Sequence, residues 1–156
     1  MTDVVSPEVR SRMMTGIRGK NTRPELLIRK CLHGRGFRYR LHDKRLPGKP
    51  DVVLPRYRAV IMIHGCFWHG HDCHLFKWPS SNEIFWREKI TKNIAVDELA
   101  VNLLHDQHWR ILKIWECALK GKQRWPLELL VDEIVYWLKN GNATCEIKGV
   151  ICNYRR

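Results

Sequence analysis

The side chains best suited to metal binding or catalysis are concentrated in one short segment, His64-Gly-Cys-Phe-Trp-His-Gly-His-Asp-Cys-His74. Cys66, His71 and Cys73 offer two thiols and one imidazole at short spacing, a set that zinc binds well. Zinc prefers four such ligands in a tetrahedron, so three local ligands leave one vertex open. Cys117, at the end of a later predicted strand, is the candidate for that vertex. Together these residues predict a closed, structural zinc site.

Two features of this site stay open at the level of sequence. His69 and His74 compete with His71 for the imidazole position. The cysteines and histidines could also be incidental members of a polar loop. We favour the metal, because so short a loop cannot be held in place by burial alone.

A carboxylate lies upstream of this loop. Pro50-Asp51 heads a predicted strand that is followed by a second strand, which matches the start of the nuclease pattern PD-(D/E)xK. The match is incomplete, because Ile63 stands where the second acid is expected and Gly65 where the lysine is expected. The backbone carbonyl of Ile63 is still a hard oxygen ligand suited to Mg²⁺. Asp51 and Ile63 are therefore candidate magnesium ligands, and a turn carboxylate is the competing interpretation of Asp51.

In the absence of that lysine, another group must take the proton of an attacking water. His64 and His69 lie in or beside the loop, and a neutral imidazole near pH 7 suits a general base. Asp97, in a predicted helix, could orient a histidine, while Glu25 could hold a metal-bound water. A solvated helix face for Asp97 and a helix cap for Glu25 are the competing interpretations.

Large aromatic side chains form a third feature of the loop. Phe67 and Trp68 lie between its metal-ligand candidates, and Trp86 follows early in the next predicted helix. A rigid aromatic wedge can unstack DNA base pairs, and a mismatch lowers the cost. The alternative is a small hydrophobic cluster packed beneath the loop.

The charge of the chain is strongly positive and unevenly distributed. The 156 residues carry a net charge of +12, and residues 1–50 contain thirteen lysines and arginines against four acids, a local charge of +9. Such a field attracts polyanions, and release of counterions from phosphates would drive binding. A well-solvated basic surface is the alternative, and charge alone does not decide between them.

The interpretation of the six cysteines depends on whether the protein resides in a reducing or an oxidising compartment. The first residues lack the charged and apolar regions of a secretory signal, so we expect a cytoplasmic protein with reduced thiols. Clustered cysteine and histidine then indicate metal binding. A membrane span is not expected, because no run of 18 apolar residues occurs.

The predicted elements alternate between helix and strand in a chain of single-domain length. They are a helix from Thr22 to Gly34 or Gly36, strands at 37–41, 51–54 and 59–63, a helix opened by Ser80 and Glu83 that ends near Gln107, a strand at 109–115 and a helix at 127–139. We expect a flexible basic arm at 1–20 and a single α/β domain at 21–156, built on a mixed sheet flanked by helices. A hairpin turn near Tyr57 would place Asp51 opposite Ile63. Residues 142–156 receive no assignment.

Four blocks of the chain closely resemble the very-short-patch repair (Vsr) endonucleases. They are Arg-Leu-Pro-Gly-Lys-Pro-Asp51, the loop from His64 to Cys73, Phe85-Trp-Arg-Glu-Lys-Ile90 and Trp115-Glu-Cys-Ala-Leu119. The resemblance covers residues 10–121, and it implies the restriction-endonuclease-like fold of the PD-(D/E)xK superfamily. It also implies a DNA repair enzyme that nicks one strand 5′ to the thymine of a T·G mismatch left by deamination of 5-methylcytosine.

The resemblance also implies roles for individual residues. Catalysis would rest on Asp51, His69, His64, Asp97 and Glu25, with one structural zinc and two catalytic Mg²⁺ ions. Magnesium would bind Asp51 and the carbonyl of Ile63, although the family commonly has threonine at that place, and zinc would bind Cys66, His71, Cys73 and Cys117. Phe67, Trp68 and Trp86 would intercalate beside the mismatch, with Met14 entering from the minor groove.

The expected partner is double-stranded DNA with a T·G mismatch, bound by a monomer that mismatch-repair proteins could assist. Two other functions remain: a restriction-type endonuclease that cuts both strands, and a zinc-stabilised DNA-binding module without catalysis. The first would need a dimer interface, and the sequence gives no indication of one. The second gives no reason to place Asp51, His64 and His69 together.

Overall fold

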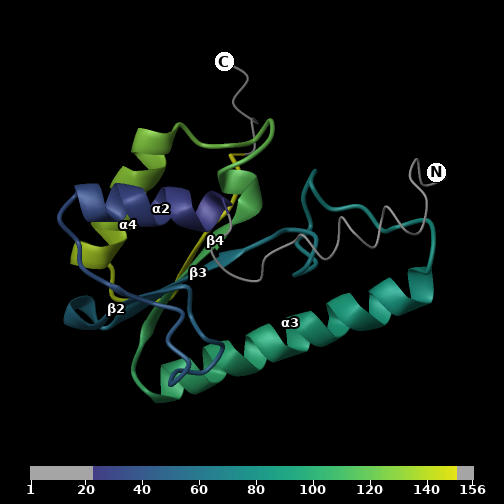
Figure 1. Ribbon diagram of the computed structural model, residues 1–156, viewed down its shortest axis with the longest axis horizontal. Helices are drawn as coiled ribbons and strands as arrows, with labels where there is room; N and C mark the ends of the chain where they lie inside the picture. Colours follow the sequence, from purple (N-terminus) through teal and green to yellow (C-terminus); the bar gives the residue numbers. More distant parts are fainter. Residues whose placement is uncertain (1–22, 151–156) are drawn as a thin grey trace.

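A five-stranded mixed sheet forms the centre of the computed structural model, which describes residues 23–150. The strands are β1 (Arg40–Leu41), β2 (Val52–Leu54), β3 (Ala59–His64), β4 (Arg110–Trp115) and β5 (Cys145–Ile147). The helices are α2 (Arg23–Gly34), α3 (Glu83–Asp106) and α4 (Leu127–Asn140), with short 3₁₀ turns at Pro55–Tyr57 and Glu116–Ala118. Figure 1 shows α2 and α4 together on one side of the sheet and α3 on the other.

The strands follow one another across the sheet in chain order, but their directions differ. β1, β2 and β3 are antiparallel neighbours, whereas β3, β4 and β5 run parallel. Antiparallel strands need only a tight turn, while parallel strands need a long crossover, and the chain supplies α3 and α4 for this purpose. The carboxyl ends of β3 and β4 therefore meet at the same edge of the sheet.

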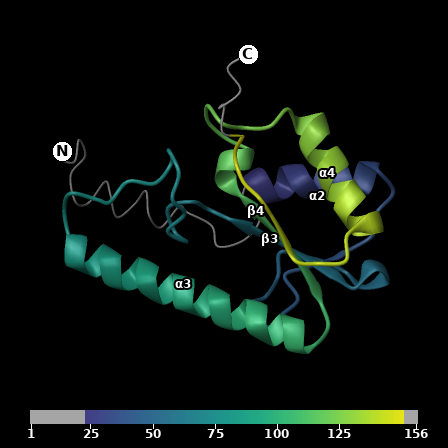
Figure 2. The ribbon, with the colours of Figure 1, turned by 180° about the vertical axis from the view of Figure 1, so that it is seen from behind.

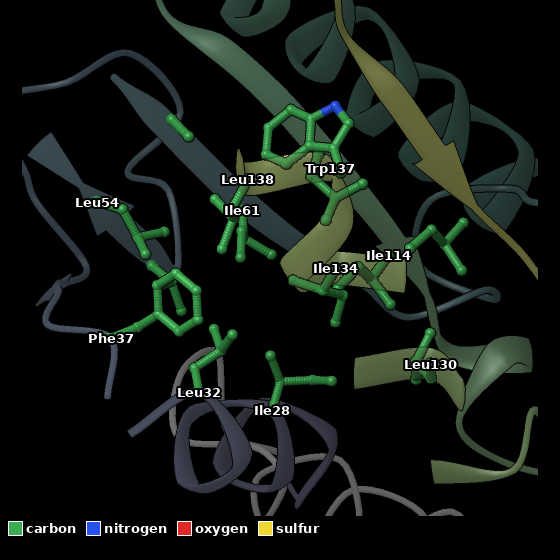
Figure 3. Packing of buried hydrophobic residues seen from close by; sticks show 14 of the residues in the cluster. Ile28, Leu32, Phe37, Leu54, Ile61, Ile114, Leu130, Ile134, Trp137 and Leu138 are labelled. Carbon is green, nitrogen blue, oxygen red and sulfur yellow. The ribbon is translucent and has the colours of Figure 1, made fainter. Parts of the chain in front are cut away.

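The core lies in two layers because successive side chains of a strand point to opposite faces. On one face Ile61 and Ile114 pack with Ile28 of α2 and Ile134 of α4, as Figure 3 shows. On the other face Val60 and Ile111 pack with Leu104 of α3. Coverage on both faces explains why β3 is an unbroken apolar run rather than an alternating strand.

The prediction of an α/β fold with a mixed sheet flanked by helices is confirmed. The helix after Thr22 ends at Gly34, the earlier of the two expected stops. The helix before Gly141 ends at Asn140, and a Cβ at Gly141 would lie only 2.7 Å from the carbonyl oxygen of Trp137. Glycine is required there because any side chain would collide with the last turn of α4.

Other boundaries differ from the prediction. The strand expected at 37–41 is reduced to Arg40–Leu41, because Phe37 is buried in the core instead of pairing in the sheet. The capping box of Ser80 and Glu83 is wrong, since Asn82 takes the cap position of α3 in a left-handed conformation. The hairpin register is shifted by one residue, so that Val52 pairs with Ile61.

The C-terminal part of the sheet was not predicted. β5 contributes only three residues beside β4, the yellow strand in Figure 2, and only Ile147 of these is buried. An isolated short strand carries no clear period, so only its pairing with β4 defines it. The expected arm at 1–20, with Met14, and residues 151–156 lie outside the part of the chain that the structure describes.

Candidate active site and metal site

Three groups of ligand-type side chains occur within residues 23–150, and each group has its ligand atoms within 4.8 Å of one another. They are Cys66, His71, Cys73 and Cys117; His64, His69 and Asp97; and Glu25, His42 and Asp51. All three use residues at or directly after the carboxyl end of β3, or side chains that reach this end. The sheet edge where parallel strands end thus gathers the chemistry that the sequence scatters over 93 positions, from 25 to 117.

The cysteine group has the dimensions of a tetrahedral zinc site. The Nδ1 atom of His71 lies 3.5 Å from Sγ of Cys66 and 3.6 Å from Sγ of Cys117. Bond lengths of about 2.3 Å to sulfur and about 2.05 Å to nitrogen give an edge of about 3.6 Å in a tetrahedron. The donor atoms therefore fit zinc, and His71 would bind through Nδ1.

Backbone amides support the three thiols of this group. Cys66 Sγ accepts from the Cys117 N–H at 3.3 Å, Cys117 Sγ from Gly149 at 3.2 Å, and Cys73 Sγ from Leu75 at 3.4 Å. Such bonds favour the thiolate forms that a metal needs. Burial raises the pKa of Cys66 and Cys117, so these side chains need a cation beside them to stay ionised at neutral pH.

The structure distinguishes the three histidines that compete for the imidazole position beside the cysteines. His71 stacks on Trp115 with ring centroids 4.1 Å apart and points into the cysteine group. His74 packs against Gly121, and both of its ring nitrogens are buried without a hydrogen-bond partner among the described residues. His69 turns the other way and contacts Asp97. Only His71 is therefore placed with the cysteines.

His69 and Asp97 form a short hydrogen bond between the loop and α3. Nδ1 of His69 lies 2.5 Å from Oδ2 of Asp97, and both side chains are partly exposed. An ionised carboxylate can only accept, so Nδ1 carries the proton and Nε2 keeps its lone pair. The pair has the geometry of a general base oriented by an acid.

His64 lies directly against His69. Their rings stack with centroids 3.9 Å apart and planes within 5°, and Trp115 packs at a steep angle to both, with its ring centroid 5.3 Å from that of His64 and 6.4 Å from that of His69. Burial lowers the pKa of His64 to about 3, so this imidazole is neutral at physiological pH. Its Nδ1 atom is buried without a partner among the described residues, which leaves one polar atom available for a ligand or a water.

Asp51 reaches the same end of β3 from β2. Its Oδ2 accepts a hydrogen bond of 2.7 Å from the backbone N–H of Ile63, one residue before His64. Extension of the observed register places Asp51 opposite Met62, whereas the sequence predicted that Asp51 pairs with Ile63. The contact between Asp51 and Ile63 is therefore made by the Asp51 side chain and not by strand pairing. Burial raises the pKa of Asp51 to about 7, and the neighbouring Glu25 adds to the rise.

Glu25 is a buried carboxylate with two side-chain donors, and the residue that would share a helix cap with it, Thr22, lies outside the described residues. Its side chain is 3% exposed and accepts from Arg29 Nη1 at 3.1 Å and from His42 Nε2 at 2.6 Å. The latter residue also donates its backbone N–H to the carbonyl of Asp51. Arg29 and His42 were missed in the sequence analysis. His42 follows the strand predicted at 37–41, and antiparallel pairing of that strand with 51–54 is the signal that would have placed it near Asp51.

Comparison with known proteins bears directly on this arrangement. A family model described as DNA mismatch endonuclease Vsr matches residues 2–75. The chain is 40% identical to the DNA mismatch endonuclease Vsr of Escherichia coli (strain K12) over 147 residues, 94% of each protein. The chain belongs to the Vsr family.

Related nicking enzymes extend this comparison. The chain is 48% identical to the type II nicking enzyme V.NmeAIP of Neisseria meningitidis over 86% of this chain and 97% of that protein. It is 47% identical to the type II nicking enzyme V.XorIIP of Xanthomonas oryzae pv. oryzae over 76% and 88%, respectively. As a Vsr-family protein the chain is a DNA endonuclease, and a nuclease of this family depends on a divalent metal ion.

The aromatic residues of this Vsr-family loop form a cluster at the amino-terminal end of α3. Phe67, Trp68 and Trp86 contact one another edge-on, with ring centroids 5.3–5.6 Å apart. Phe76 and Phe85 extend the cluster on either side. The three central rings are only partly buried, so they are neither core residues nor fully exposed.

The loop that carries these rings is attached to α3. The Asn93 side chain donates to the carbonyl of Trp68 at 2.8 Å. Gly70 has a φ of +63°, and a Cβ there would lie 2.8 Å from both Ile90 and Ile94. Glycine is needed because the loop backbone lies directly on the helix. Asn93 is a third residue that the sequence analysis missed, since an asparagine on a polar helix carries no distinctive signal.

None of the described helices of this Vsr-family chain is long and apolar enough to span a bilayer.

Proposed function

We propose that this endonuclease nicks one strand of DNA 5′ to the thymine of a T·G mismatch arising from deamination of 5-methylcytosine, and so begins very short patch repair. The observation that supports this most directly is the convergence at the end of β3: the Asp51 carboxylate is bonded to Ile63, and the stacked imidazoles follow at once. The family's mismatch endonuclease in Escherichia coli matches nearly the whole chain.

Magnesium is the metal that fits the oxygen donors of this site. Ile63 directs its N–H toward Asp51, and in a strand the carbonyl of the same residue points to the same side, so both oxygens face one place. A carboxylate and a backbone carbonyl are ligands that Mg²⁺ accepts while keeping several waters. When bound, Mg²⁺ supplies charge that stabilises the attacking and leaving oxygens of the phosphodiester, and we propose two such ions.

The imidazoles would handle the proton. His69 is held by Asp97 with its Nε2 lone pair directed away from the acid, so it accepts the proton of the attacking water. His64, kept neutral by burial, lies against it and holds water or a phosphate oxygen through its ring N–H. Glu25 orients water beside Asp51.

The zinc would be structural. Three thiols and the His71 imidazole fill all four tetrahedral positions, so no vertex is left for a substrate or a reactive water. One zinc ion would instead connect the loop to the strand end at Cys117, and so place the loop histidines beside Asp51. We propose that residues 21–156 form a single domain and that the protein acts as a monomer.

The aromatic cluster would read the mismatch. Phe67, Trp68 and Trp86 already have their rings at angles of 65–83° to one another, so they cannot all stack within one base step without rotating. Insertion beside T·G costs less than insertion beside a paired step, which favours the damaged site. Met14 and the basic arm at 1–20 would contact the minor groove and the phosphates.

Nicking of a panel of T·G duplexes with varied flanking bases, in Mg²⁺ and in EDTA, tests this function. We expect single-strand cleavage 5′ to the thymine in Mg²⁺ only, and loss of nicking with retained DNA binding in Asp51→Ala. Cleavage of both strands of fully paired DNA would instead indicate a restriction-type enzyme. Binding without cleavage under every condition would indicate a DNA-binding module. Adding a mismatch-repair protein to the assay tests assistance by such partners.

A further inference from the structure

His42 contacts both acids of the proposed magnesium site. Its Nε2 atom lies 2.6 Å from Oε2 of Glu25, and its backbone N–H donates to the carbonyl oxygen of Asp51 at 3.3 Å. The imidazole, Glu25 and Asp51 have ligand atoms within 4.8 Å of one another. One residue therefore connects the end of β1, helix α2 and the start of β2.

The backbone of His42 is held in an uncommon conformation. Its φ is +45°, a left-handed value that is uncommon outside glycine, although asparagine, aspartate and histidine adopt it more often than other residues do. Strained residues of this kind persist where the surroundings determine them, and they concentrate at functional sites. Here the left-handed conformation occurs immediately after β1, and the imidazole contacts Glu25 of α2.

Glu25 depends on its donors for a defined orientation. A buried carboxylate has several rotamers of similar energy unless hydrogen bonds select one, and Oε2 accepts from both Arg29 and His42. Because an ionised carboxylate only accepts, Nε2 of His42 carries the proton. Arg29 approaches along the same helix, four residues on, whereas His42 approaches from the side on which Asp51 lies.

We propose that His42 is a positioning residue, which holds the Glu25 carboxylate against Asp51 so that the two acids form one preorganised site for a divalent cation. This inference rests on the proposed function. His42 touches neither the scissile phosphate nor the metal in this role, and it acts through Glu25. Partners of this kind typically change metal affinity or activity by about 10-fold to 100-fold when they are removed.

Two substitutions of His42 separate the hydrogen bond from the backbone conformation. In His42→Asn the left-handed conformation is kept at lower cost, but the shorter side chain does not reach Glu25. In His42→Gln the amide N–H can take the place of Nε2–H. His33→Asn, an exposed histidine at the end of α2, is the matched control.

The measurements are single-turnover nicking, the Mg²⁺ concentration that gives half of the maximal rate, Mn²⁺ binding to the DNA-free protein by calorimetry, and Tm. We expect His42→Asn to bind Mn²⁺ about 10-fold more weakly and to nick about 10-fold to 100-fold more slowly, with Tm close to that of the wild type. His42→Gln should recover most of both losses, and His33→Asn should behave as the wild type. Adding His42→Asn to Glu25→Gln should cost little further activity, because both changes remove the same interaction.

Several outcomes would overturn the proposal. One is a His42→Asn variant that nicks DNA and binds Mn²⁺ as the wild type does. Another is an equal loss of nicking rate and Mn²⁺ affinity in His42→Asn and His42→Gln, in proportion to the decrease in Tm. If His42→Asn does not fold, a folded His42→Gln that nicks more than about 10-fold slower than the wild type also contradicts it. Nicking by Asp51→Ala would mean that the proposed function itself is wrong, whereas an inactive Asp51→Ala beside a normal His42→Asn removes only the role of His42.

Discussion

Nδ1 of His69 lies 2.5 Å from Oδ2 of Asp97, although the two residues are 28 positions apart in the chain. The contact joins the cysteine- and histidine-rich loop at 64–74 to the middle of α3, and it occupies Nδ1 of His69 rather than Nε2. We predict that His69→Ala lowers the single-turnover nicking rate by about 10²-fold to 10⁴-fold, as expected for loss of a general base.

Asp97→Asn should also slow nicking, by about 10-fold or more, because an amide can stabilise the wrong tautomer of His69. The double variant should be little slower than His69→Ala alone, since the acid acts through the histidine. Asp106→Asn, an exposed acid at the end of the same helix, is the control and should nick normally. Independent, multiplicative losses in the double variant would argue against the pair.

Binding of Mg²⁺ should depend on pH through Asp51. Burial, with Glu25 nearby, raises the pKa of Asp51 to about 7, so most of these carboxyls hold a proton at pH 6. A metal must displace this proton, so its apparent affinity should rise about 5-fold from pH 6 to pH 7, reach about 10-fold by pH 8 and level off above that. Calorimetry with Mg²⁺ or Mn²⁺ in buffers of different ionisation enthalpy measures both the affinity and the proton released. A flat affinity between pH 6 and pH 8 would contradict this assignment.

The same shift predicts how the stability of the protein without bound Mg²⁺ changes with pH. Between pH 3.8 and about 7 the folded chain keeps a proton on Asp51 that the unfolded chain has lost. The free energy of unfolding should therefore decrease as pH rises through this window, by up to about 1.4 kcal/mol per pH unit from this group. Urea unfolding in buffer without added Mg²⁺ at pH 5 and pH 7 measures it, and Asp51→Asn should remove this component. If the variant retains the full slope, another group is responsible.

Zinc should be bound at about one ion per chain, as the four donors imply. Cys73→Ser or Cys117→Ser should release zinc and destabilise the fold by more than about 4 kcal/mol, the range reached when a structural metal is lost. Metal analysis and chemical unfolding provide the measurements. Cys145→Ser is a suitable control, because Cys145 is exposed and lies outside the cysteine group. A stable wild-type chain free of metal would rule out the site.

Discrimination of the mismatch should depend on Trp68. Trp68→Ala should reduce the preference for T·G over paired duplex by about 10-fold, in line with the energy of one aromatic–base stack. Competition between T·G and fully paired duplexes for binding, measured in EDTA so that no strand is cut, gives this preference. Tyr136→Ala removes an exposed aromatic side chain on α4 and should leave the preference unchanged. If Trp68→Ala keeps full discrimination, the cluster serves packing alone.

Much of the local structure could be predicted from the sequence. The helix from Arg23 to Gly34 follows from a threonine start, apolar spacing and a glycine stop. The strands Ala59–His64 and Arg110–Trp115 follow from apolar runs too short for helices. Three of the cysteine-group residues follow from spacing within one loop. These signals are local, since each depends on residues a few positions apart.

The remaining features depend on contacts between residues far apart in the chain. No spacing rule decides that His71 faces Cys117 while His69 faces Asp97, because the parallel pairing of β3 with β4 and the packing of α3 set those directions. The pairing of His42 with Glu25 likewise requires β1 and α2 to be in place. Sequence by itself determined which kinds of side chain are present and which segments form elements. Tertiary structure alone decided which of them share a site, because burial and long-range hydrogen bonds orient side chains that local preferences leave free to rotate.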